Sequence, residues 1–502
     1  MTMIAAIAFL GLVSIVQVLM SEPVLELDFF SLMREDINKV ERFDNLLDQT
    51  VRLLLPPQEA QDYISKYPGS EFKFYVYDNL PENITHRAIQ QCIYDNQKSW
   101  FKGDQELFIK EYCAFGAQIC TPNHTQNPQD STYVKRRTNI NADTVLAQIF
   151  SEYHGPLRTH DPEETSLFIV PYATGGHCEC AQFRCKYFRS GENTEPQQFI
   201  SSLKYLNSSN PISLQKHLFL DSGNYMFDAL KINTLVARIE PPVKQFIAET
   251  RQRGRGHITI PYSNSIIDYQ PISLMKHTMH PKSIALSVVM STQISGNGQV
   301  RVDFVSQSSQ GLLFGEASNM TLGGLPVHIN DMTSSRALTD EVDVMKLYQR
   351  SIFCPVFRGD GPTQKRFFDA IVNGCLPVVL EYQSFVPGHT SHFCPGADPI
   401  ELVYPFAVGG FLGPYFNNMG IDYSQFVVTV DGTCGVSCIP TTLESLMKNT
   451  TALRKKQQSM AWYARLWTYG MEKNMLQYPD AVSAILVKAR HLSHNYLFRF
   501  LG

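Results

Sequence analysis

The sequence lacks the short motifs on which several large classes of protein depend. No run of Lys and Arg stands out and the formal net charge is −4, which gives no support for nucleic-acid binding. The Gly-x-Ser-x-Gly, His-Glu-x-x-His and P-loop patterns are all missing, so the hydrolases and nucleotidases that use them are not indicated. No Asp-x-Asp pair is present to hold a metal ion through two carboxylates. What remains is a globular balance, 44% apolar and 18% charged over 502 residues, which is sufficient for two domains.

An apolar segment near the N-terminus predicts membrane attachment. Residues 4–20 are apolar apart from Ser14 and Gln17, about the minimum length that spans a bilayer. The segment ends without the Ala-x-Ala pattern of a cleavage site, which favours a retained anchor at residues 1–21 over a cleaved signal peptide. No Lys or Arg precedes it, so charge specifies its orientation only weakly. We expect an anchored protein with a lumenal body.

Sequons and cysteines also favour an exported body. Candidate N-glycosylation sites occur at Asn83, Asn123, Asn207, Asn319 and Asn449. The 11 cysteines include the cluster Cys178, Cys180 and Cys185 and the close pair Cys434 and Cys438. In an oxidising lumen these cysteines predict disulfides, with one thiol left over because the count is odd. A zinc site formed by the cluster together with His177 is the alternative interpretation.

The segment after the anchor predicts a helical stem over residues 22–69. Apolar residues recur at a 4-3 spacing, with one miss, from Met33 to Leu54, and Pro56-Pro57 ends the helix. We expect this helix to pack on the body of its own chain. The alternative is self-association through a short coiled coil, which would make the stem the contact of a homo- or hetero-oligomer.

Two successive series of strands and helices predict an α/β fold with two Rossmann-like domains facing a cleft. The first domain covers residues 70–250 and the second residues 251–440, followed at 441–502 by helices that open with a Thr441-x-x-Glu444 capping box. The first series has strands at 72–77, 166–170 and 217–220. The second series has strands at 257–260, 283–289, 351–354, 376–380 and 425–430.

The segment from Arg350 to Leu380 has the pattern of a phosphate-binding unit. It reads as a strand, a glycine loop, a helix, a glycine stop and a second strand. Gly359 and Gly361 allow close approach of the backbone, and Thr363 is placed to cap the helix that follows. Free N–H groups and a positive dipole at that helix start favour a pyrophosphate. Gly374 is placed to end the helix.

Charged side chains surround the same predicted seat. Arg358, Lys365 and Arg366 supply cationic donors, and Arg suits bidentate contacts with phosphate. Asp369, one turn into the helix, is placed to accept hydrogen bonds from a ribose diol. The alternative is that Asp369 pairs with Arg366 at a spacing of three on the helix surface.

These residues resemble the signature of the exostosin-like glycosyltransferases, the GT47 type. The matching positions are Ser351, Phe353, Cys354, Gly359, Arg366, Asp369, Gly374, Cys375, Pro377 and Val378. Further similarity lies at 73–78, 161–171, 260–262, 298–301 and 421–424, so that the resemblance runs from about residue 70 to about residue 470. One departure is Leu214-Gln-Lys-His217, where the family often has Gly-Arg-Asp-His, so the resemblance assigns no acceptor-side role to that region.

The resemblance implies a GT-B fold that transfers a sugar from a UDP-sugar to a glycan or polysaccharide, with inversion, in the Golgi membrane as a single-pass type II protein. It adds Arg301 to the donor-site residues. The missing Asp-x-Asp pair leaves the GT-A alternative without its usual metal-binding device, so we expect no metal or other cofactor to be required. The rival interpretation is an inactive glycan-binding or assembly subunit with the same fold.

An inverting transfer needs a base that takes the proton of the acceptor hydroxyl. The fold implied by the resemblance supplies this base from its N-terminal domain. The candidates are Asp161, His160, His177 and His217.

Overall fold

The computed structural model describes most of the two domains. The described residues are 45–97, 142–180, 195–206, 213–214, 216–221, 234–238, 256–261, 281–290, 292, 299–331, 341–357, 364–381, 404–407, 419–469 and 479–500. The predicted anchor at 1–21 and the stem up to residue 44 lie outside them. Among the helices within these ranges, none combines the length and the apolar character needed to cross a bilayer.

The first lobe is built on a parallel sheet of five strands in the order β1-β2-β3-β4-β5. The strands are β1 (Phe74–Val76), β2 (Leu167–Ala173), β3 (His217–Asp221), β4 (Leu235–Arg238) and β5 (Gly256–Thr259). The helices and turns of this lobe are η2 (Glu82–Ile84), α5 (His86–Gln97), α7 (Ala142–Glu152), α8 (Thr174–Cys180) and α9 (Glu195–Ser201). β2 and β3 are buried along their whole length, as expected for strands covered on both faces.

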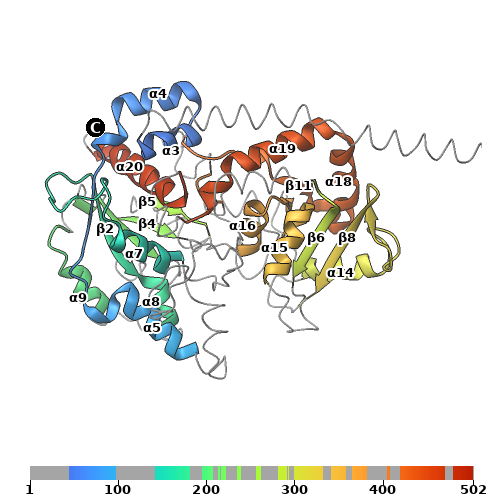
Figure 1. Ribbon diagram of the computed structural model, residues 1–502, viewed down its shortest axis with the longest axis horizontal. Helices are drawn as coiled ribbons and strands as arrows, with labels where there is room; N and C mark the ends of the chain where they lie inside the picture. Colours follow the sequence, from blue (N-terminus) through green and yellow to red (C-terminus); the bar gives the residue numbers. More distant parts are fainter. Residues whose placement is uncertain are drawn as a thin grey trace, which may run out of the picture.

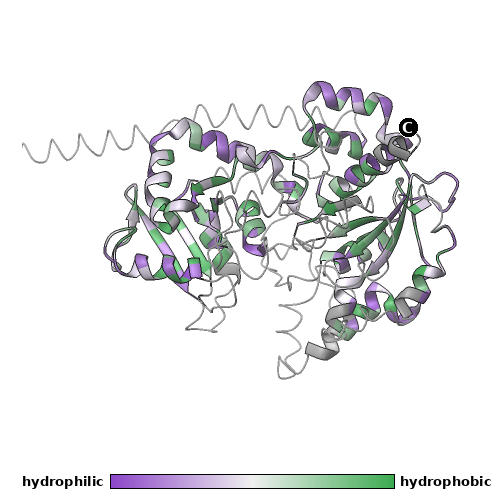
Figure 2. Cartoon of the chain, turned by 180° about the vertical axis from the view of Figure 1, so that it is seen from behind, coloured by the Kyte–Doolittle hydropathy of each residue, from purple (hydrophilic) through white to green (hydrophobic). Residues whose placement is uncertain are grey.

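The second lobe has a sheet in the order β11-β10-β9-β6-β8-β7, parallel except for the short edge strand β7. Its strands are β6 (Ile284–Met290), β7 (Thr321–Leu322), β8 (Leu325–Asp331), β9 (Ser351–Pro355), β10 (Leu376–Glu381) and β11 (Val428–Asp431). Its helices are α14 (Gln299–Ser309), α15 (Glu341–Arg350), α16 (Lys365–Val372), η4 (Tyr423–Gln425) and η5 (Gly432–Ser437). The lobes lie side by side in Figure 1, and Figure 2 shows largely apolar strands together with helices that carry both hydrophilic and hydrophobic residues. Two parallel α/β sheets of this kind are consistent with a GT-B-like arrangement.

One predicted domain boundary does not coincide with the division between the two sheets. The strand expected to open the second domain is β5, which pairs with β4 in the first sheet through Leu235↔Gly256 and Arg238↔Thr259. The first sheet therefore continues past residue 250 to Thr259. A change of composition in the sequence does not by itself separate two domains, because such changes also occur within a domain.

The described part of the stem packs on the body of its own chain. It forms α3 (Leu46–Leu54), α4 (Pro57–Lys66) and the short turn η1 (Gly69–Glu71), with Pro57 at the start of α4. The apolar face of α3 is buried against α20 (Ala481–Phe500), and the Thr50 and Ser483 hydroxyls are 2.9 Å apart. This confirms the interpretation as a packed helix for α3, whose apolar face is not available for a coiled coil.

The C-terminal helices return the chain to the first lobe. α18 (Cys438–Lys448), α19 (Thr450–Tyr463) and η6 (Ala464–Trp467) begin on the second lobe, whereas α20 packs against α3, β4 and β5 (Figure 1). The Tyr469 hydroxyl donates to the carbonyl of Pro261 at 2.5 Å, which ties this return to the end of β5. The predicted capping box is wrong, because α18 starts at Cys438 and Thr441 lies inside it, with its hydroxyl bonded to the Cys438 carbonyl.

Three disulfides join described cysteines. Cys434–Cys438 was predicted and is confirmed. Cys180 pairs with Cys92 of α5, and not within its own cluster, while Cys185 lies outside the described residues. The Cys354–Cys375 bond joins β9 to the start of β10 and was not predicted.

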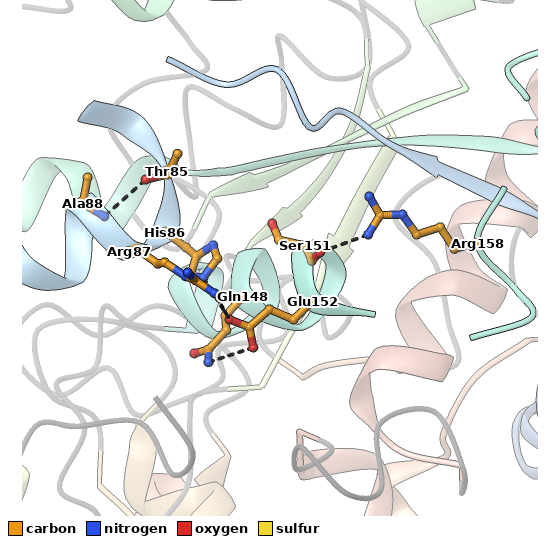
Figure 3. A network of polar contacts seen from close by, with 8 residues as sticks. All are labelled: Thr85, His86, Arg87, Ala88, Gln148, Ser151, Glu152 and Arg158. Carbon is orange, nitrogen blue, oxygen red and sulfur yellow. Dashed lines mark hydrogen bonds and ion pairs between the residues drawn. The ribbon is translucent and has the colours of Figure 1, made fainter. Parts of the chain in front are cut away.

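The helices α5 and α7 are joined by a polar network around Glu152 (Figure 3). Its carboxylate accepts from Arg87 at 3.4 Å and from Gln148 at 3.3 Å, and lies 3.4 Å from His86. These contacts, with that of His86 the largest, lower the pKa of Glu152, so it stays ionised at neutral pH. The network holds one end of α5, and the Cys92–Cys180 disulfide joins the same helix to α8.

Candidate functional site

The second sheet contains the point where an α/β sheet of this type binds ligands. From β6 the chain passes through α14 to β7 and β8 on one side, then returns through α15 to β9 on the other side. The strand order therefore reverses between β6 and β9. Ligands bind outside the carboxyl ends of the strands at such a reversal. The loops that follow these two strands lead into α14 and α16, so two helix N-termini meet there.

Arg301 contacts the residues on both sides of the glycine loop. It is the third residue of α14, and its guanidinium donates to the Phe357 carbonyl at 3.3 Å and to the Gln364 side-chain oxygen at 3.4 Å. These partners are the last described residue before the loop and the first one after it. The loop residues Arg358, Gly359, Gly361 and Thr363 themselves lie outside the described residues. Arg301 therefore puts a fixed positive charge beside the predicted pyrophosphate seat.

Burial and a glycine set the position and the end of α16, the helix that follows the loop. Six of its eight residues are buried, among them Phe367 and Phe368. The helix ends at Val372 and is followed by the C-cap Asn373 and by Gly374, whose φ of +75° suits a residue without a side chain. The Gly374 and Cys375 amides bond back to the carbonyls of Ile371 and Ala370. The predicted glycine stop is confirmed. The N-cap is Gln364, one residue after the predicted Thr363, and its side chain makes no capping hydrogen bond.

An aromatic cluster seats α16 against the C-terminal segment. Phe367 packs on Tyr404, which stacks on Tyr423 at 4.6 Å between ring centroids. The Tyr423 hydroxyl donates to the Pro405 carbonyl and accepts from the Trp467 indole N–H, so this buried ring is fully engaged. The 421–424 segment, which the resemblance singled out, thus has a structural role: it supports the helix of the signature.

Asp369 holds a lysine on its own helix. Both of its oxygens lie within hydrogen-bond distance of Lys365 Nζ, at 2.8 and 3.1 Å, and both side chains are nearly buried. The ion pair that the structure shows for Asp369 is with Lys365 at a spacing of four, whereas the alternative interpretation paired it with Arg366 at a spacing of three. This contact uses part of the acceptor capacity of the carboxylate and places the Lys365 ammonium at the first turn of α16.

Arg366 is half-buried beside α15. Burial raises the pKa of Tyr348 to about 12, and the positive charge of Arg366 partly opposes the rise. Arg301 is the described donor-site candidate that bonds to a residue on each side of the glycine loop.

Three of the candidate base residues, His160, Asp161 and His217, lie at the amino-terminal edge of the first sheet. His160 and Asp161 are exposed in the loop that precedes β2, where Asp161 accepts from the Glu163 amide at 2.9 Å. His217 is the first residue of β3. All three are therefore at the amino ends of parallel strands, whereas ligands bind at the carboxyl ends.

His217 is in addition a core residue. Its Nδ1 lies 2.6 Å from the Ser213 carbonyl and its Nε2 lies 2.9 Å from the Tyr77 hydroxyl, while its ring stacks on Phe168. The side chain is 0% exposed, and burial lowers its pKa to about 4. A ring with both nitrogens engaged inside the core does not reach a substrate hydroxyl. We therefore no longer propose it as the base.

The carboxyl edge of the first sheet carries polar groups that the sequence analysis largely missed. Thr174, just after β2, donates its hydroxyl to Asp221 at the end of β3, at 2.8 Å. Asp143 of α7, fully buried, accepts the amides of Gly175 and Gly176 at 2.6 and 3.4 Å. Their position in the sequence could have indicated these residues. Thr174, Gly175, Gly176 and Asp221 each follow a predicted strand, which is where parallel sheets bind ligands, whereas Asp143 does not.

His177 is the candidate base that lies at this edge. It sits in α8, and its Nδ1 is 2.6 Å from the hydroxyl of Tyr172, a buried residue of β2. Among the candidates, it is the one that follows the carboxyl end of a central strand.

Comparison with known proteins gives one family and short matches to two relatives. The exostosin GT47 domain matches residues 68–392, more than half of the chain. A probable xyloglucan galactosyltransferase GT13 of Arabidopsis thaliana is 42% identical over 52 residues, 10% of this chain and 11% of that protein. A probable xyloglucan galactosyltransferase GT15 of the same plant is 32% identical over 88 residues, 18% of this chain and 16% of that protein. The chain therefore belongs to the exostosin GT47 family, which its signature residues resemble.

Proposed function

We propose that the protein transfers a sugar from a UDP-sugar to a glycan or polysaccharide acceptor, with inversion at the anomeric carbon. The observation that carries the proposal is Arg301, which joins the two ends of the glycine loop at the strand-order reversal of the second sheet. Positive groups at that place stabilise the diphosphate as it leaves, which is the electrostatic part of the reaction. Family membership supports the same chemistry.

The two relatives suggest which substrates to try first. Both are named as galactosyltransferases that act on xyloglucan, but the matched segments cover only 11% and 16% of their lengths. We propose UDP-galactose as the first donor and xyloglucan oligosaccharides as the first acceptors. No metal ion is required in this proposal, because cationic side chains and helix N-termini meet the diphosphate.

A panel of UDP-sugars, read out by released UDP, tests the activity. We expect one donor to be turned over only when a glycan acceptor is present, with the rate unchanged by EDTA. Loss of UDP binding on chelation would contradict the metal-free site. An inactive assembly subunit, the rival function, predicts no turnover with any donor and no heat of UDP binding by calorimetry.

We further propose that the body lies in the Golgi lumen behind a type II anchor at residues 1–21. Asn83, Asn319 and Asn449 are exposed, and the disulfides need an oxidising compartment. Asn123 and Asn207 lie outside the described residues. We expect endoglycosidase to lower the apparent mass of the protein expressed in eukaryotic cells, and alkaline carbonate to leave it in the membrane pellet. An unchanged mass together with release into the supernatant would contradict this location.

A further inference from the structure

We infer that His177 is the catalytic base of the transfer and that Tyr172 is its positioning residue. The inference rests on the proposed function and adds to it the group that activates the acceptor. In the step we propose, Nε2 of His177 takes the proton of the acceptor hydroxyl as its oxygen bonds to the anomeric carbon. The bond from that carbon to the diphosphate oxygen breaks, and its electron pair leaves with UDP. The imidazolium then releases its proton to water.

The first argument is the place of His177 in the fold. β2 is a buried inner strand of the first sheet, and α8 begins at the residue after it, so His177 lies four residues beyond the carboxyl end of the strand. The carboxyl edges of parallel sheets are where ligands bind, and Arg301 stands at the corresponding edge of the second sheet. In this proposal Arg301 binds the sugar donor and His177 activates the acceptor, and each side chain lies at the carboxyl edge of the sheet in its own lobe.

The second argument is that the turn carrying His177 is held from several sides. Buried Asp143 accepts both glycine amides at the start of α8. A Cβ on Gly176 would lie 2.3 Å from the Thr144 hydroxyl oxygen, so the backbone approaches α7 more closely than any larger residue allows. Cys180, at the end of α8, is bonded to Cys92 of α5. A catalytic group gains most when its position is fixed before the substrate binds.

The third argument is the contact between Tyr172 and His177. The hydroxyl of Tyr172 lies 2.6 Å from Nδ1, and the tyrosine itself is only 1% exposed, so it is a fixed support. When Nδ1–H donates to this hydroxyl, the lone pair of the ring is on Nε2, the nitrogen that our step uses. An orienting partner on the second nitrogen is the arrangement that makes a histidine an effective base. His177 itself is half-buried.

The test compares His177→Gln and Tyr172→Phe with wild type, using UDP-galactose and xyloglucan oligosaccharides or the pair that the panel turns over. We expect His177→Gln to lower kcat about 100-fold or more, the usual effect of losing a general base. The Kd for UDP and the melting temperature should stay unchanged. Tyr172→Phe, which removes one hydroxyl, should lower kcat about tenfold with the acceptor KM unchanged, since one lost orienting hydrogen bond amounts to about 1.4 kcal/mol.

Chemical rescue separates a base from a structural residue. Added imidazole should restore part of the kcat of His177→Ala, because a small base can occupy the space left by the ring. His154→Gln, which changes an exposed histidine of the same lobe, is the matched control and should behave as wild type. A His177→Gln enzyme that keeps a third or more of kcat would overturn the inference and leave the proposed function intact. Absence of turnover by the wild-type protein with every donor and acceptor would overturn both.

Discussion

Arg301→Ala should weaken UDP binding about 10- to 100-fold while leaving the fold intact. A charge-assisted hydrogen bond contributes about 1.5–3 kcal/mol, which corresponds to this range. The side chain is half-buried, and it is the group that joins Phe357 to Gln364 across the mouth of the loop. Removing it takes away a cation from the seat and also the link between the two loop ends. Arg301→Lys, which keeps the positive charge but loses the planar guanidinium that makes two parallel hydrogen bonds, should have an intermediate effect.

Arg350→Ala is the matched control for that experiment. Arg350 ends α15 and precedes β9, so it lies at the opposite edge of the same sheet, where it is exposed. Calorimetry with UDP should give the wild-type Kd for Arg350→Ala. Equal losses in the two variants would mean that net charge, and not the position of Arg301, governs binding. An unchanged Kd in Arg301→Ala would remove the main support for the donor site.

Loss of the Cys354–Cys375 disulfide should lower the free energy of unfolding by about 3 kcal/mol, from the chain-entropy model for a loop of this length. The bond closes a sequence separation of 21 residues that contains the glycine loop and all of α16. Both cysteines are buried, with exposed fractions of 1% and 0%. The double variant Cys354→Ala/Cys375→Ala avoids placing a polar group in the core.

The Cys434–Cys438 disulfide provides the comparison. It closes a separation of only 4 residues and is half-exposed, so its double alanine variant should lose about 2 kcal/mol or less by the same relation. Urea unfolding of the two variants beside wild type measures both losses. A smaller loss at 354/375 than at 434/438 would show that the longer loop is not held by its disulfide. The Kd for UDP should also rise more in the 354/375 variant, because that disulfide spans the predicted donor-binding loop.

The position of the base residues shows where the sequence interpretation failed and why. The strand at 166–170 was predicted, and His160 and Asp161 precede it, so a rule that ligands bind after parallel strands would have excluded them. The same rule favours His177, which follows the strand. His217 required the fold, because its burial depends on Tyr77 and Phe168, which come from two distant segments of the chain.

The sequence by itself determined the local units of this protein. The end of α16 before Gly374, the helix break at Pro56-Pro57 and the Cys434–Cys438 pair each depend on residues that are close together in the sequence. The family resemblance came from the same local pattern.

Only the tertiary structure decided which distant groups meet. It placed β5 in the first sheet, joined Cys92 to Cys180, brought Arg301 to both ends of the glycine loop and paired Asp369 with Lys365. Most of these outcomes depend on the order of strands in a sheet and on the packing of helices against it. Such choices are set by the burial of whole surfaces, for which a short stretch of sequence carries no direct signal.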